Sequence, residues 1–88
     1  MADNIFDISF DYEDISYSGW VNPSDDLNDS GKPVSFHVVL NGVSFGYLFY
    51  HDAGWHVNER RPRGLVECAG TAIEQYYNRL ESERVSEQ

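Results

Sequence analysis

Residues 25 to 31, DDLNDSG, carry oxygen-bearing side chains at a spacing typical of a calcium-binding loop. Asp26, Asn28 and Ser30, followed by a glycine, match the opening of an EF-hand loop. The closing position of such a loop supplies a glutamate that binds calcium with both oxygens, and here it is His37. We therefore expect residues 25 to 31 to form a turn-rich loop without bound calcium.

The histidines and the single cysteine are the other residues that could ligate a metal or catalyse a reaction. His37 and His56 are predicted on one face of a sheet but out of step along it, and His51 is predicted on the opposite face. A metal needs three or four ligands within about 2–2.3 Å of one point. Cys68 would need a neighbouring histidine base to act as a nucleophile, and no spacing implies one. We predict no metal, no cofactor and no catalytic residue, and hence a non-enzymatic protein.

The composition bounds the class of protein. Eighty-eight residues suffice for one domain, residues 1–88, and 41% hydrophobic residues with 15% aromatics are more than a disordered chain carries. A net charge of −9 disfavours direct binding to nucleic acid or to an anionic membrane. No apolar run approaches the roughly 20 residues that span a bilayer. The start, MADNIF, lacks the features of a signal peptide, and one cysteine suits a reducing compartment, so we expect a cytoplasmic protein.

The negative charge is concentrated in the first third of the chain. Residues 1–31 hold eight acids and no lysine or arginine, whereas residues 32–88 hold seven acids and six bases. Two structural interpretations compete with a functional one. Acids on an edge strand prevent sheet-to-sheet aggregation, and Arg60, Arg61 and Arg63 could neutralise the acidic segment within the molecule.

The segment VSFHVVLNGVSFGYLFY, residues 34 to 50, predicts a β-hairpin. Asn41-Gly42 is the preferred pair for a two-residue type I′ turn. The resulting register puts the following residues on the core face: Val34, Phe36, Val38, Leu40, Val43, Phe45, Tyr47 and Phe49. It puts Val39, Leu48 and Tyr50 on the outer face. A third strand follows a three-residue loop, Asp52-Ala53-Gly54, and pairs Phe49 with Val57.

A helix is predicted from Leu65 to Ser82, with Gly64 as its N-cap. Its apolar face comprises Leu65, Ala69, Ala72, Ile73, Tyr76 and Leu80. Gly70 costs about 1 kcal/mol in a helix interior, so we expect the helix to approach the bulky sheet face of Phe36, Phe45, Tyr47 and Phe49 closely there.

The first 22 residues alternate between apolar and acidic or hydroxyl side chains, with a change of parity near Glu13-Asp14. This pattern predicts either one bent strand or a hairpin. An acidic loop is expected at 22–33, and frayed ends at 1–3 and 83–88. The fold class is therefore α+β: an antiparallel meander of four to five strands with one C-terminal helix packed on one face.

The small size, the acidity and the lack of catalytic motifs are similar in profile to acidic inhibitor proteins of the phage anti-restriction, anti-CRISPR or toxin-immunity type, without a shared motif. This profile predicts a protein partner with a basic or nucleic-acid-binding surface. The predicted contact residues are the acids Asp7, Asp11, Glu13, Asp14, Asp25, Asp26 and Asp29, with Tyr12, Tyr17 and Trp20 as aromatic anchors. The alternative is an accessory module that forms a homodimer through Val39, Leu48 and Tyr50.

Overall fold

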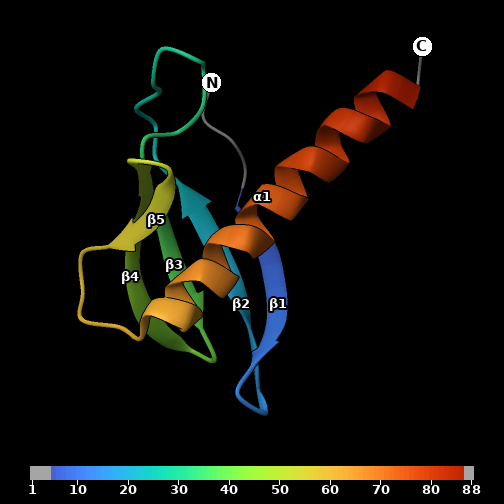
Figure 1. Cartoon of the computed structure of the whole chain (residues 1–88). Helices are drawn as coiled ribbons and strands as arrows, with labels where there is room; N and C mark the ends of the chain where they lie inside the picture. The colour runs from blue at the N-terminus through green and yellow to red at the C-terminus, as the bar shows by residue number, and fades with distance from the viewer. Residues whose placement is uncertain (1–4, 87–88) are drawn as a thin grey trace.

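Five antiparallel strands and one helix make up the computed structural model, which describes residues 5–86, with side chains to residue 82. The strands are β1 (Phe6–Tyr12), β2 (Ile15–Pro23), β3 (Phe36–Leu40), β4 (Val43–His51) and β5 (Gly54–Val57), and the helix is α1 (Arg63–Ser86). The strands pair in sequence order, β1-β2-β3-β4-β5 (Figure 1). The α+β meander with a C-terminal helix is confirmed.

The acidic N-terminal segment is a hairpin, which settles the alternative of one bent strand. Glu13 and Asp14 form the turn with φ values of 49° and 65°, the left-handed backbone of a type I′ turn. The register runs from Tyr12 opposite Ile15 to Phe6 opposite Val21. The change of parity near Glu13-Asp14 in the sequence is this turn.

The second hairpin has the predicted Asn41-Gly42 turn, with φ values of 51° and 78°. The Asn41 side chain also ties this turn to β2. Its Oδ1 accepts a hydrogen bond from Ser18 N at 3.0 Å, and its Nδ2 donates to Ser16 O at 3.3 Å. Asn41 N donates to Ser18 O at 2.7 Å. The turn thus extends the β2–β3 pairing beyond the end of β3.

Substitution of Asn41 by glycine is expected to lower the free energy of unfolding by about 1–2 kcal/mol. Glycine keeps the positive φ, so the loss combines the two side-chain hydrogen bonds, each of which contributes about 0.5–1.5 kcal/mol, with the greater freedom of glycine in the unfolded chain. Urea denaturation followed by circular dichroism measures the change. Val43→Thr, at an exposed position of the same hairpin, is the control and should shift stability by less than about 0.5 kcal/mol.

A β-bulge in β4 corrects the predicted face assignment. The register shifts between Val38 and Val39, so that Val39 lies opposite Ser44 but Val38 lies opposite Gly46. The extra residue reverses the alternation beyond it. Phe45 remains buried, Leu48 becomes fully buried, and Tyr47 is 49% exposed. The predicted core positions Val34 and Val43 are exposed as well, and Phe49 is only partly buried.

The third turn is one residue shorter than predicted. Asp52 and Ala53, with φ values of 52° and 60°, form a two-residue turn, and Gly54 already belongs to β5. Phe49 therefore pairs with His56, and Val57 pairs with Leu48. Asp-Ala is a weak sequence signal for a two-residue turn with left-handed backbone. The glycine that follows is typical of the last position of a three-residue loop, which is why the sequence predicts the longer turn.

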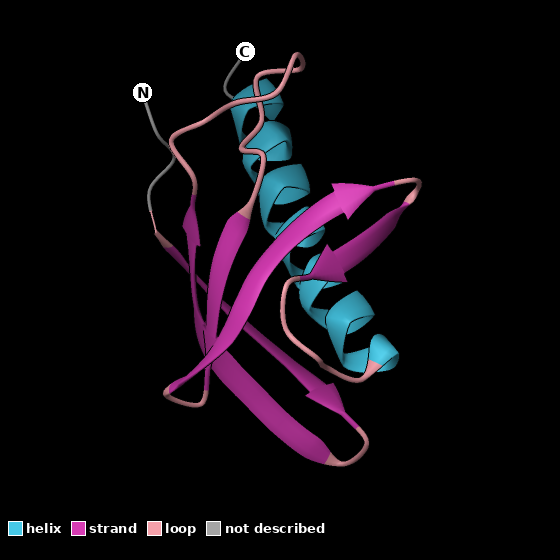
Figure 2. Ribbon diagram, turned by 90° about the vertical axis from the view of Figure 1, so that its left-hand side faces the viewer, coloured by secondary structure: helices cyan, strands magenta, loops and turns pink. Residues whose placement is uncertain are grey.

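The helix crosses the concave side of a strongly curled sheet (Figure 2). It contacts β1 and β5, the two edge strands. The buried core comprises Phe6, Ile8, Val21, Phe36, Val38, Leu40, Phe45, Leu48, Trp55, Leu65, Val66, Ala69 and Ile73. Of the predicted apolar helix face, Ala72 and Tyr76 are partly buried and Leu80 is 37% exposed.

The helix boundaries differ from the predicted ones. The first helical hydrogen bond runs from Val66 N to Pro62 O at 3.1 Å, so Pro62 rather than Gly64 occupies the N-cap position. The helix ends at Ser86 rather than Ser82. Of the ends expected to fray, residues 83–86 belong to α1, and residues 1–3 and 87–88 lie outside the described residues.

Candidate binding surface

The acidic side chains of the first third face solvent. All seven predicted contact acids with described side chains are exposed: Asp7, Asp11, Glu13, Asp14, Asp25, Asp26 and Asp29. Within residues 5–82, none of them forms an ion pair with a lysine or arginine. Asp11 accepts a hydrogen bond from Ser16 Oγ at 2.8 Å. The negative charge is thus left available to a partner.

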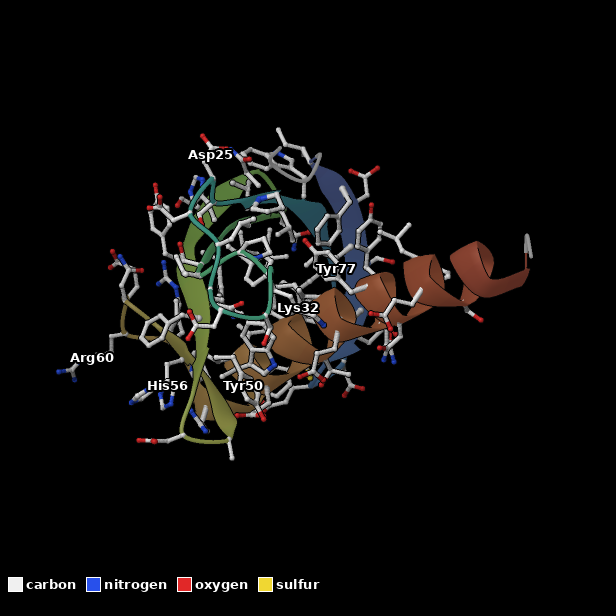
Figure 3. All side chains as sticks on the ribbon, turned by 90° about the horizontal axis from the view of Figure 1, so that it is seen from above. Asp25, Lys32, Tyr50, His56, Arg60 and Tyr77 are labelled. Carbon is white, nitrogen blue, oxygen red and sulfur yellow. The ribbon has the colours of Figure 1, made fainter. Side chains whose placement is uncertain are left out.

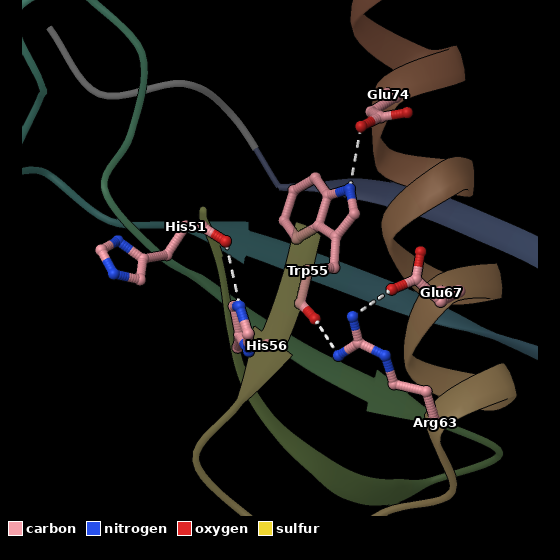
Figure 4. A network of polar contacts seen from close by, with 6 residues as sticks. All are labelled: His51, Trp55, His56, Arg63, Glu67 and Glu74. Carbon is pink, nitrogen blue, oxygen red and sulfur yellow. Dashed lines mark hydrogen bonds and ion pairs between the residues drawn. The ribbon is translucent and has the colours of Figure 1, made fainter. Parts of the chain in front are cut away.

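Two of the three arginines that could have neutralised these acids, Arg61 and Arg63, bind other elements. Arg61 Nε donates to Phe45 O at 2.9 Å, and its guanidinium lies 5.5 Å from the Phe45 ring centroid. Arg63 Nη1 donates to Trp55 O at 2.8 Å, and its Nη2 pairs with Glu67 at 3.0 Å (Figure 4). Both hold the β4–β5 segment against the start of α1. Internal neutralisation of the acidic segment is therefore wrong for these two residues.

The seven acids do not form one contiguous field. Asp7 and Asp11 lie on the outer face of β1, the face turned away from α1. Glu13 and Asp14 lie in the β1–β2 turn, whereas the other three acids belong to the loop at the opposite end of the sheet (Figure 1). The seven predicted contact acids are thus divided between opposite ends of the sheet, and only some of them can contact one partner surface.

Two of the three predicted aromatic anchors are engaged inside the domain. Tyr12 packs against the core beside Gly64, at the beginning of α1. Its pKa is raised above the usual tyrosine value, first by its hydrogen bond to the Glu13 carboxylate and then by burial and the Glu13 charge. Tyr17 stacks on Phe10 with ring centroids 5.6 Å apart. Trp20, 37% exposed, remains the available anchor.

Trp20 belongs to a row of rings across the outer face, here called the aromatic strip: Trp20, His37, Tyr47, Phe49 and His56. The Trp20 and His37 rings meet edge to face at 5.7 Å, and His37 stacks on Tyr47 at 4.6 Å. Phe49 stacks on His56 at 5.6 Å. The strip thus crosses β2 to β5 on the face that α1 leaves uncovered.

Two of the acids lie at the aromatic strip. Asp7 is the cross-strand partner of Trp20, so their side chains project side by side from the outer face. A hollow of about 350 Å³ opens between the loop after β2 and the strip, lined by Asp25, His37 and Tyr47 among others. Asp7 and Asp25 thus flank the exposed rings of Trp20 and Tyr47, and this combination is the candidate binding surface.

The predicted self-association residues do not share a surface. Leu48 is fully buried, because the bulge turns it into the core. Tyr50 is exposed but lies on the helix side of the sheet, where its ring meets Trp55 edge to face at 5.5 Å. Figure 3 shows Tyr50 on that side and His56 on the outer one. Only Val39, which pairs with Trp20, lies on the outer face as predicted.

The sequence pattern does not reveal the aromatic strip, because regular alternation along the strand places Tyr47 and Phe49 on the core face. A glycine inside an otherwise regular strand pattern, here Gly46, is the sequence signal for a bulge. Had the parity been reversed at Gly46, Tyr47 and Phe49 would have joined His37 and His56 on the outer face.

The candidate metal and nucleophile residues do not converge within the described part of the chain. Asn28 Oδ1 accepts hydrogen bonds from Ser30 N and Lys32 N, so the calcium-like motif is a self-bonded turn. No group of three or more His, Cys, Asp or Glu among these residues could hold a metal ion. Cys68 is a partly buried free thiol. Among the described residues, no helix combines the length and the apolar character that crossing a membrane requires.

Comparison with known proteins gives no family for this chain: neither a protein-family model, nor a curated protein, nor a solved structure matches it significantly.

Proposed function

We propose that this chain is a non-enzymatic binding protein that contacts a basic protein through the outer face of its sheet. The observation that carries the proposal is the exposed pair of rings, Trp20 and Tyr47, flanked by Asp7 and Asp25, neither of which is engaged by a described cation. A surface of this kind suits arginine. Carboxylates bind its guanidinium in a bidentate manner, and exposed indole and phenol rings accept it on their faces.

The partner class follows from the charge. A net charge of −9 accelerates encounter with a basic surface and opposes encounter with nucleic acid or an anionic membrane. We propose an inhibitory role, in which the protein occupies a basic or nucleic-acid-binding site in the manner of anti-restriction, anti-CRISPR or immunity proteins. We also propose a cytoplasmic location, which the single free thiol suits.

The double substitution Asp7→Asn, Asp25→Asn is expected to weaken partner binding about tenfold, equivalent to about 1.4 kcal/mol. It removes the two negative charges beside the rings, and asparagine keeps nearly the same side-chain size and shape as aspartate. Affinity capture from host lysate at low and high salt identifies the partner, and calorimetric titration with the purified partner measures affinity. The dependence of affinity on salt should also become shallower.

The matched control is Glu13→Gln, Asp14→Asn, which makes the same charge change in the β1–β2 turn. It should reduce affinity by much less. Equal losses in both double variants would show that net charge rather than the outer face governs binding, and no loss in either would contradict the proposal. Trp20→Ala should weaken binding further, with the far-ultraviolet circular dichroism of the domain preserved.

A further inference from the structure

The helix side of the sheet holds a second feature that the outer face does not explain. A pocket of about 320 Å³ opens between α1, the ends of β3 to β5 and the loop after β2. Six of its lining residues carry the argument below: Lys32, Phe36, Tyr50, Trp55, Ile73 and Glu74. Its volume is that of a site for a small organic molecule.

The floor of this pocket is apolar and well packed. Phe36, Trp55 and Ile73 are each at most 6% exposed. The Phe36 and Trp55 rings pack at 5.8 Å, and Tyr50 meets Trp55 edge to face at its opening. A flat or branched apolar group would cover this floor and remove its remaining surface from water.

One side of the pocket presents the exposed cation of Lys32, carried on a backbone that is held in place. The backbone of Lys32 is held on both sides by Asn28: Lys32 N donates to Asn28 Oδ1 at 3.0 Å, and Asn28 N donates to Lys32 O at 2.7 Å. Its ammonium group forms no hydrogen bond or ion pair with any residue in the described part of the chain. Figure 3 shows Lys32 and Tyr50 on the helix side of the sheet.

The other side presents a fixed carboxylate. Trp55 Nε1 donates to Glu74 Oε2 at 2.9 Å, which holds the carboxylate against the pocket floor (Figure 4). The other oxygen, Oε1, is left to accept a further hydrogen bond. Glu74 forms no ion pair with Lys32, so both charges are left available to a ligand.

We propose that this pocket binds a small zwitterion with an apolar body, the class to which large aromatic and aliphatic α-amino acids belong. Lys32 pairs with the carboxylate of the ligand, Glu74 accepts from its ammonium group, and the side chain of the ligand covers Phe36, Trp55 and Ile73. Each charge of the ligand meets an opposite charge of the protein, as burial of a zwitterion requires. The site lies on the other side of the sheet from the aromatic strip and is independent of the proposed partner.

The test is an NMR titration of the Trp55 indole N–H, the donor to Glu74. In a ¹⁵N-labelled Trp20→Phe variant, Trp55 supplies the single indole N–H signal, because the chain has two tryptophans. L-Phenylalanine and L-leucine, added to about 10 mM, are expected to shift this signal in a saturable manner. N-Acetyl-L-phenylalanine, which lacks the ammonium group, and phenethylamine, which lacks the carboxylate, are expected to bind about tenfold or more weakly.

Two conservative variants assign the charges. Lys32→Gln should weaken L-phenylalanine binding about tenfold and leave phenethylamine binding unchanged. Glu74→Gln keeps an oxygen that can accept from Trp55, and it should weaken L-phenylalanine binding while leaving N-acetyl-L-phenylalanine binding unchanged. Asp29→Asn, on the same loop but outside the pocket lining, is the control and should bind as the parent does. The proposal is overturned if no amino acid gives a saturable shift, if the singly charged probes bind as well as the zwitterions, or if both variants bind as the parent does.

Discussion

Replacing Gly19 with alanine is expected to lower the free energy of unfolding by more than about 3 kcal/mol. A Cβ at this position in β2 would overlap the carbonyl oxygen of Val39 and lie 2.7 Å from its carbonyl carbon. These are backbone atoms of β3, so no rotamer change relieves the overlap, and the two strands must separate. Overpacking costs about 1–3 kcal/mol where side chains adjust, and a backbone obstacle costs more.

Such a loss is a large part of the stability of the whole domain, since proteins are stable by about 0.05–0.15 kcal/mol per residue. Urea denaturation followed by circular dichroism measures it. Ser18→Ala, at the exposed neighbouring position, is the matched control and should change stability by less than about 0.5 kcal/mol. A Gly19→Ala protein as stable as the control would mean that β2 and β3 do not approach each other as described.

The hairpin turns show where local sequence decides structure. Asn41-Gly42 was predicted correctly, because few pairs other than Asn-Gly adopt two consecutive left-handed residues readily. Glu13-Asp14 and Asp52-Ala53 adopt the same backbone without that signal. The short connection between the paired strands imposes this backbone on them. In the sequence, Glu13-Asp14 is therefore marked only by a change of parity, and the pattern at Asp52-Ala53 predicts a turn one residue too long.

The candidate surface was harder to predict than the fold, because a one-residue slip moves a strand's side chains to the other face. The bulge before Gly46 exchanges Tyr47 for Leu48, which at once creates the aromatic strip and removes the predicted dimer patch. The exposure of Asp7 and Asp25 is predictable from the sequence, because unpaired aspartate side chains are rarely buried. Their position beside Trp20 and Tyr47 depends on pairing between strands distant in the sequence, which composition does not encode.

The fate of the arginines also depends on tertiary structure. Nothing in the sequence prevents Arg61 and Arg63 from approaching the acidic hairpin. In the folded chain, however, they donate hydrogen bonds to carbonyl oxygens of β4 and β5 beside the start of α1. By binding there, the two arginines leave the carboxylates of β1 unneutralised. The same contacts that hold the helix to the sheet therefore also leave the outer face acidic.

Gly70→Ala is expected to destabilise the domain by about 1–3 kcal/mol, although alanine is favoured over glycine in a helix by about 1 kcal/mol. The sequence predicted a close approach at Gly70, but the neighbour is Trp55 rather than Phe36, Phe45, Tyr47 or Phe49. A Cβ would overlap the indole and lie 2.5 Å from its Cδ2. The indole cannot swing away without breaking its hydrogen bond to Glu74, so α1 must lift from the sheet.

A double-mutant cycle with Trp55→Leu isolates this contact. Trp55→Leu removes the indole and its hydrogen bond to Glu74. Comparing the Trp55→Leu protein with the double variant therefore reports the effect of Gly70→Ala without the overlap. In that background Gly70→Ala should stabilise the domain by up to about 1 kcal/mol, reversing its sign. Denaturation midpoints of the four proteins measure the coupling, with Thr71→Ala on the exposed side of α1 as the control. An equal destabilisation in both backgrounds would show that Gly70 is required by the helix itself and not by its contact with Trp55.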